Sequence, residues 1–106
     1  MDRKKYKIDK NLKRFLEKIN KRFQMEKVIL FGSRARGDEK IYSDYDIIMI
    51  SKDFKNLKWH KRIEEIVKFW ESDKDIDVLP YTPEEFEEKL KMRTIVKQAV
   101  SEGIVI

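Results

Sequence analysis

FGSRARGDEKIYSDYD, residues 31–46, decides the fold, because an apolar run borders each end of it. Residues 28–31 read VILF, a pattern typical of a buried β-strand, and the run stops at Gly32 and Ser33. Where a strand ends in a glycine turn, backbone N–H groups can bind a phosphate oxygen, and glycine lets the backbone approach closely. We therefore expect Gly32 and Ser33 to form an anion-binding turn.

Two aspartates, Asp44 and Asp46, open a second apolar run at residues 47–50. Side chains two positions apart on a strand share a face, so we expect both carboxylates to point the same way. Neighbouring anions repel each other unless a cation lies between them, and Mg²⁺ prefers carboxylate, water and phosphate oxygens. The pattern predicts a magnesium site close to the phosphate-binding turn.

A third strand is expected at residues 75–81, which read DIDVLPY. By the alternation of side chains, Asp75 and Asp77 lie on one face of this strand. Asp77 is the expected third acidic ligand, because apolar residues flank it, whereas Asp75 stands at the solvated start of the strand. If the strands are neighbours, Asp77 projects beside Asp44 and Asp46.

The remaining segments predict helices that cover the sheet. Apolar residues recur at helical spacing after Asp9, at about residues 57–71, and after a capping box that begins at Thr82, with a possible break near residues 91–94. Residues 104–106 are expected to add an edge strand or to meet a partner. Together these elements predict an α/β fold with a small mixed sheet of three to four strands flanked by helices.

The length of 106 residues predicts a single domain, residues 1–106. Charged residues make up 42% of the chain and the net charge is +5, which favours an anionic partner. The absence of cysteine excludes a disulfide scaffold and a thiolate site. No apolar run has the length of a membrane span, so we expect a cytoplasmic protein without membrane association. Direct nucleic-acid binding is not expected, because a basic stripe with clustered aromatics is missing.

Two arginines, Arg34 and Arg36, follow the glycine–serine turn in an expected short helical turn that ends near Gly37. The planar fork of arginine donates two hydrogen bonds to phosphate oxygens, so both residues are candidates for nucleotide binding. Tyr45 is expected to pack on the face opposite the aspartates. His60, the single histidine, is expected to be a surface residue.

Gly32-Ser33, ten further residues and then Asp44-Tyr45-Asp46 resemble the signature of the DNA-polymerase-β-type nucleotidyltransferases. The fuller strings GSRARG and SDYD resemble those of minimal nucleotidyltransferases that pair with HEPN-domain proteins. The likeness covers nearly the whole chain, including the acidic third strand and the helix that follows it. It implies a polymerase-β-like nucleotidyltransferase fold.

The resemblance also implies an activity, which is Mg²⁺-dependent transfer of AMP from ATP to a tyrosine of a HEPN-domain toxin. The chain would then be the antitoxin of a type VII toxin–antitoxin pair and part of a hetero-oligomer. Asp44, Asp46 and Asp77 would be the catalytic residues and would bind two Mg²⁺ ions. Gly32 and Ser33 would hold the β and γ phosphates.

Three other functions stay open from the sequence. The chain could transfer a nucleotide to a small molecule such as an aminoglycoside, with a second subunit completing the acceptor site. It could be a non-catalytic antitoxin that blocks its partner by binding, although retention of all three acidic positions argues against this. It could also be a small basic RNA-binding module, although the clustered aromatics and the basic stripe expected for single-strand binding are missing.

Overall fold

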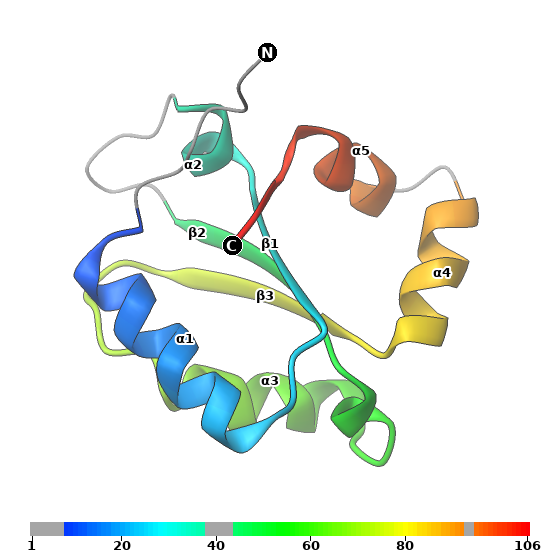
Figure 1. Cartoon of the computed structure of the whole chain (residues 1–106), viewed down its shortest axis with the longest axis horizontal. Coiled ribbons are helices and arrows are strands. Elements are labelled where there is room, and N and C mark those ends of the chain that lie inside the picture. The colour runs from blue at the N-terminus through cyan, green and yellow to red at the C-terminus, as the bar shows by residue number, and fades with distance from the viewer. Residues whose placement is uncertain (1–7, 38–43, 93–94) are drawn as a thin grey trace.

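The computed structural model describes residues 8–37, 44–92 and 95–106, which form an α/β fold (Figure 1). Its elements, in chain order, are α1 (Lys10–Arg22), β1 (Lys27–Phe31), α2 (Ser33–Arg36), β2 (Tyr45–Ile50), the 3₁₀-helix η1 (Lys52–Phe54), α3 (Trp59–Val67), β3 (Ile76–Tyr81), α4 (Pro83–Lys91), α5 (Ile95–Glu102) and β4 (Ile104–Val105). No helix in these three ranges is long and apolar enough to cross a bilayer.

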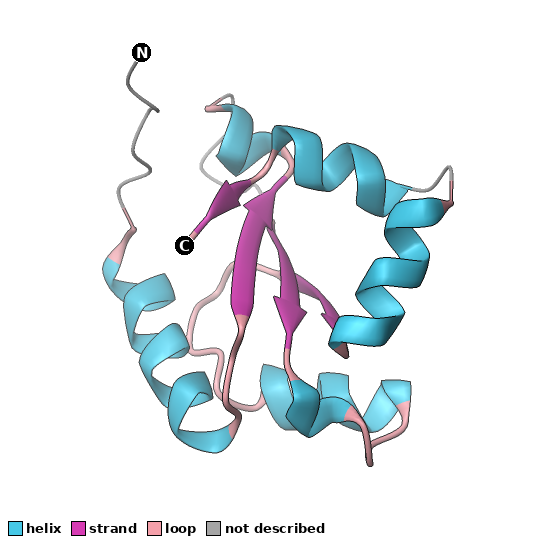
Figure 2. Ribbon diagram, turned by 45° about the vertical axis from the view of Figure 1, so that its right-hand side comes forward, coloured by secondary structure: helices cyan, strands magenta, loops and turns pink. Residues whose placement is uncertain are grey.

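The four strands form one sheet in the order β3-β2-β1-β4. β2 and β3 are parallel, whereas β1 is antiparallel to both β2 and β4. The sheet is therefore mixed, as the sequence predicted. Figure 2 shows this sheet in magenta with helices around it.

Alternate residues of β2 face two different layers of the core. Tyr45, Ile47 and Met49 pack with apolar side chains of α1 and α3, including Phe15 and Ile66. The next residues along, among them Ile48 and Ile50, pack with residues of α4 and α5. Helices α1 and α3 therefore cover one face of the sheet, and α4 and α5 cover part of the other. By the alternation of side chains, Asp46 faces the α4/α5 side.

Helix α3 is shorter than the expected helix at residues 57–71. It ends at Val67, after which Phe69 and Trp70 donate backbone hydrogen bonds to the carbonyls three residues before them, at 3.1 and 2.9 Å. This tighter turn brings the Trp70 ring against Phe15 and Tyr45, at centroid distances of 5.2 and 5.0 Å. The apolar spacing of residues 69 and 70 therefore reflects core packing beyond the end of the helix.

The C-terminal part of the chain follows the sequence prediction. The Thr82 side chain accepts a hydrogen bond from the Glu85 backbone, and the Glu85 carboxylate accepts one from the Thr82 backbone, so the capping box is present. Helix α4 ends at Lys91, where the expected break begins, α5 starts at Ile95, and Gly103 separates α5 from β4. β4 adds an edge strand beside β1, with Ile29 opposite Val105 and Leu30 opposite Ile104.

Candidate functional site

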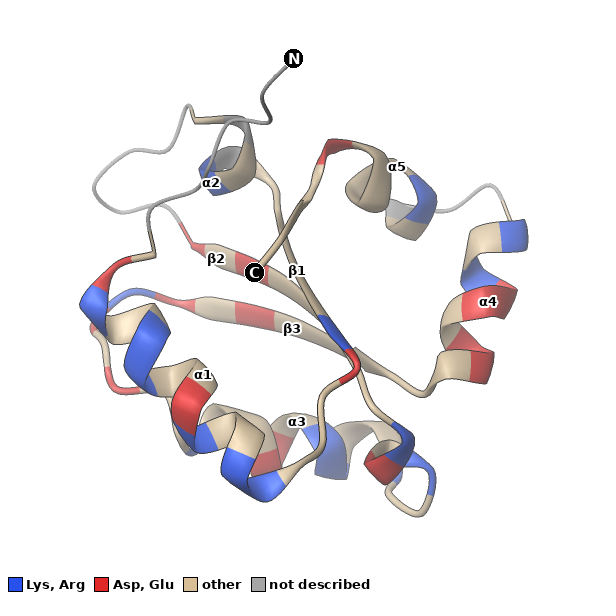
Figure 3. Cartoon of the chain, viewed as in Figure 1, with Lys and Arg blue, Asp and Glu red and all other residues tan. Residues whose placement is uncertain are grey.

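The register of the sheet brings two acidic residues together from distant parts of the chain. Asp46 on β2 pairs directly with Asp77 on the parallel neighbour β3. Paired residues of adjacent strands point to the same face and are separated by about 4.8 Å in the hydrogen-bonding direction. Asp46 is half-buried and Asp77 is exposed, so the pair is open to solvent on one side. Acidic segments of β2 and β3 lie side by side in Figure 3.

The glycine turn contacts the same carboxylate. Gly32 has a φ of 76°, in the left-handed region that glycine adopts at little cost. A Cβ atom added to Gly32 would lie 2.3 Å from Oδ2 of Asp46. The backbone of the turn therefore approaches Asp46 more closely than any other residue type would allow, and the expected turn and the acidic strand meet at this point.

Ser33 begins the single turn of α2, in which the Ala35 N–H donates to the Gly32 carbonyl at 3.1 Å. Gly37, with a φ of 83°, follows α2, so the expected short helical turn before this glycine is confirmed. The side chains of Ser33 and Arg36 lie outside the described part of the structure. Their contacts with a nucleotide remain predictions from the sequence.

Asp44 is exposed and precedes β2 by one residue. The Tyr45 N–H donates to the Asp75 carbonyl at 3.0 Å, so the parallel pairing begins beside Asp44. Among the residues described, no three acidic, histidine or cysteine side chains lie close enough together to ligate one metal ion. Mg²⁺ commonly takes one or two carboxylates and completes its shell with water and phosphate oxygens. The half-buried Asp46 carboxylate and the exposed Asp77 carboxylate fit that donor set.

Arg34 lies in the expected helical turn, and its side chain packs against the core. Its side chain is buried, and its guanidinium carbon lies 3.8 Å from the centroid of the Tyr45 ring. Tyr45 is itself buried, as predicted, in the core layer formed with α1 and α3. Because Tyr45 and Asp46 point to opposite faces of β2, this contact holds Arg34 on the side of the sheet away from the acidic pair.

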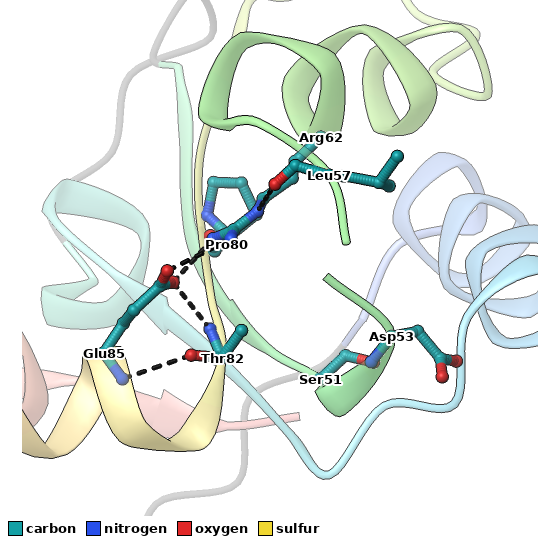
Figure 4. A network of polar contacts seen from close by, with 7 residues as sticks. All are labelled: Ser51, Asp53, Leu57, Arg62, Pro80, Thr82 and Glu85. Atoms are coloured by element: carbon teal, nitrogen blue, oxygen red, sulfur yellow. Dashed lines mark hydrogen bonds and ion pairs between the residues drawn. The ribbon is translucent and has the colours of Figure 1, made fainter. Parts of the chain in front are cut away.

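Arg62 is a buried arginine that the sequence analysis missed, and its hydrogen bonds connect α3 to β3 and α4. Arg62 donates from Nε to the Leu57 carbonyl at 2.9 Å and from Nη1 to the Pro80 carbonyl at 3.0 Å. Its guanidinium also binds the Glu85 carboxylate at 2.6 and 3.1 Å, as Figure 4 shows. The hydrogen bond from Arg62 is the main cause that lowers the pKa of Glu85. The sequence contained one signal for the burial of Arg62. It lies four residues before the buried Ile66, so both side chains are on one face of α3.

An open hollow of about 340 Å³ lies beside this network. Its lining residues are Trp59, Tyr81, Glu85 and Lys89. The Trp59 and Tyr81 rings are 5.2 Å apart, and burial is the first cause that raises the pKa of Tyr81. Tyr81 is four residues after Asp77 on β3, or roughly 13 Å along the strand, so the hollow is separate from the acidic pair. His60, next to Trp59, is exposed, as expected.

Comparison with known proteins places this arrangement in a family. The family model described as nucleotidyltransferase domain matches residues 12–106. A Methanocaldococcus jannaschii protein named "putative protein adenylyltransferase" is 37% identical over 57 residues, which cover 54% of this chain and 58% of that protein. The chain thus spans little more than half the length of this curated relative.

Two solved structures share the fold. The crystal structure of a "putative nucleotidyltransferase" from Sulfolobus solfataricus has a TM-score of 0.62 and 26% identity, covering 88% of this chain and 73% of that one. A toxin–antitoxin structure with AMP-PNP has a TM-score of 0.53 and 21% identity, covering 86% and 68%, and at this identity supports the fold alone. Because the family model spans most of the sequence, the chain belongs to the nucleotidyltransferase domain family.

Proposed function

We propose that the chain transfers AMP from ATP to a hydroxyl group of a partner protein. The observation that carries the proposal is the pairing of Asp46 with Asp77 directly beside the Gly32 turn. A phosphate-binding turn next to two solvent-accessible carboxylates suits a triphosphate with its metal ion, because the turn binds the anion and the carboxylates bind the cation.

Each part of the site has a proposed role in holding the nucleotide. The backbone at Gly32 and Ser33 binds the β and γ phosphates. Two Mg²⁺ ions are proposed, with Asp44, Asp46 and Asp77 as the ligands and no more than two of these carboxylates on either ion. When bound, Mg²⁺ supplies neutralisation of triphosphate charge and polarisation of the reacting oxygens. The half-buried position of Asp46 and the exposed position of Asp77 leave space for substrate oxygens on the α4/α5 side of the sheet.

The proposed reaction is an in-line displacement at the α-phosphorus. The acceptor hydroxyl oxygen forms a bond to this phosphorus, while the bond from the phosphorus to the bridging oxygen breaks and pyrophosphate leaves. The hydroxyl proton passes to a base. Asp77 is the proposed base because it is exposed and lies next to Asp46.

The proposed acceptor is a tyrosine of a HEPN-domain toxin, with this chain as its antitoxin. Support comes from the GSRARG and SDYD strings, which resemble those of minimal nucleotidyltransferases with HEPN partners. The name of the Methanocaldococcus jannaschii relative supports a protein acceptor, and the fold shared with a toxin–antitoxin structure is compatible with such a partner.

The test is incubation of the chain with labelled ATP, with and without Mg²⁺ and with and without its co-purified helical partner. Mg²⁺-dependent label on a partner tyrosine, lost when that tyrosine is changed to phenylalanine, is the expected result. Label on a small molecule instead would contradict the protein acceptor. Tight binding without label on either protein would contradict catalysis and favour an antitoxin that acts by binding alone.

A matched pair of variants separates catalysis from folding. The double variant Asp44→Asn, Asp46→Asn is expected to fold, with equal or higher stability because charge repulsion is relieved, and to lose transfer at least ~100-fold. Asp73→Asn, at an exposed turn before β3, is the control and should retain activity. Unfolding of the double variant would mean that the carboxylates are structural.

A further inference from the structure

The ring of Tyr45 is held from three directions. The guanidinium of Arg34 stacks on it at 3.8 Å, the Trp70 ring meets it at 5.0 Å with an interplanar angle of 66°, and its hydroxyl donates to the Asp9 carboxylate. Asp9 also caps α1, through Oδ1 and the Leu12 N–H at 2.8 Å. The ring is thereby fixed to α1, α2 and the segment that follows α3.

Tyr45 stands between Asp44 and Asp46 in the chain, so whatever fixes its ring on one face of β2 also fixes the backbone that carries both carboxylates on the other. Arg34 stands two residues after Gly32, on the short α2 turn. The stacking contact therefore links the Gly32 turn to β2 on the face of the strand opposite the carboxylates. The distance between the Gly32 turn and β2 has little tolerance, because there is no room for even one methyl group between Gly32 and Asp46.

We propose that Arg34 is a positioning residue and not a phosphate ligand. It sets the distance between the Gly32 turn and Asp46 by stacking on Tyr45. The inference rests on the proposed nucleotide site, which these two groups form. A phosphate contact by Arg34 would require the guanidinium to leave a buried position over an aromatic ring, and such contacts stabilise a desolvated cation.

A double-mutant cycle on stability tests the contact without any assay of transfer. Arg34→Met removes the guanidinium, Tyr45→Leu removes the ring, and urea denaturation is measured for both single variants and the double variant. We expect the double variant to be destabilised by less than the sum, with a coupling of about five-fold in the unfolding equilibrium constant. Arg34→Lys keeps the charge without the planar group and is the second variant if Arg34→Met does not fold.

The control cycle pairs Tyr45→Leu with Arg22→Met. Arg22 also lies over an aromatic ring, that of Phe23, at 4.4 Å, but it is at the far end of α1 from Asp9. The losses of stability caused by Arg22→Met and Tyr45→Leu should therefore add in the double variant. Additive effects in the Arg34 cycle as well would overturn the proposal.

ATP affinity with and without Mg²⁺ distinguishes positioning from phosphate binding. For Arg34→Met we expect affinity in EDTA to stay within about two-fold of the wild type, because the turn itself is unchanged. The gain in affinity on adding Mg²⁺ should fall at least ~five-fold, since that gain depends on the carboxylates. A loss of about ten-fold or more in EDTA, with the Mg²⁺ gain intact, would overturn the proposal in favour of a phosphate contact. Failure of the wild type to bind ATP would overturn the proposed function, and the stability cycle would then decide separately whether Arg34 and Tyr45 are coupled.

Discussion

Substitution of Gly32 by alanine should displace the Asp46 carboxylate while the chain stays folded. The new Cβ would lie 2.3 Å from Oδ2 of Asp46 and 3.2 Å from its Cγ. Ordinary van der Waals contact begins at 3.4 Å, so the carboxylate must move by about 1 Å. The carboxylate is the end of a short side chain, and rotation can accommodate the methyl group without unfolding the strand.

The expected magnitudes follow from two separate costs. A residue with a side chain in the left-handed region is destabilised by about 1–2 kcal/mol, which is the expected loss of unfolding free energy. A misplacement of about 1 Å at a reacting centre costs on the order of 100-fold in rate. Gly32→Ala should therefore remain folded, lose about 1–2 kcal/mol, and lose about 100-fold in nucleotide transfer.

The assay compares Gly32→Ala with Gly37→Ala by urea denaturation, by Mg²⁺-dependent ATP binding, and by transfer of labelled AMP. Gly37 is the matched control because its φ of 83° imposes a similar backbone strain at an exposed position after α2. Both variants should lose similar stability, but Gly32→Ala should lose far more Mg²⁺-dependent binding and transfer. If the two variants behaved alike in all three measurements, the close approach of Gly32 to Asp46 would have no functional importance.

Three further predictions concern the packing around the site. Arg62→Met should lower the free energy of unfolding by about 2–4 kcal/mol, because it leaves the part-buried Leu57 carbonyl and the buried Pro80 carbonyl without their hydrogen bonds. Arg22→Met, at a partly exposed ion pair, should cost about 1 kcal/mol or less, and urea denaturation compares the two variants. Arg62 lowers the pKa of Glu85, so the stability from this carboxylate is fully present above its unfolded pKa and is lost as the pH falls through the folded value; Glu85→Gln should flatten the acid side of the stability profile, and an unchanged profile would contradict the assignment. Gly103→Ala would place a Cβ 2.7 Å from the Ala99 carbonyl oxygen, which cannot rotate away, so β4 should detach and its amide hydrogens should exchange faster than in the wild type.

Much of the fold could be predicted because local patterns and tertiary structure agree. Side chains alternate in direction along a strand, which predicted the residues among 45–50 that share a face. The structure places Tyr45 in one core layer and Ile48 in the other. Asp46 could be predicted to lie beside Asp77 because each residue stands near the start of a predicted strand and the two strands were assumed to be neighbours. The register meets that assumption.

The sequence predictions that differed from the structure involve contacts between distant segments. A charged residue after a phosphate-binding turn suggests a ligand, but Arg34 is buried because the Tyr45 ring lies beneath α2. The sequence analysis assigned no role to Arg62, and its role depends on Glu85, which is 23 residues away in the chain. Helical periodicity reports neighbours three or four residues apart and contains no information about such partners.

The two acidic strands repeat the same local pattern, Asp-X-Asp, so the sequence near the site permits more than one alignment of β3 on β2. A slip of two residues would put Asp75 opposite Asp46 while keeping every side chain on its own face. At the far end of β3 the Ser51 N–H, directly after β2, donates to the Tyr81 carbonyl at 3.0 Å, and this contact would be lost in the slipped alignment. A backbone contact remote from the acidic pair thus helps to decide which aspartate of β3 lies opposite Asp46.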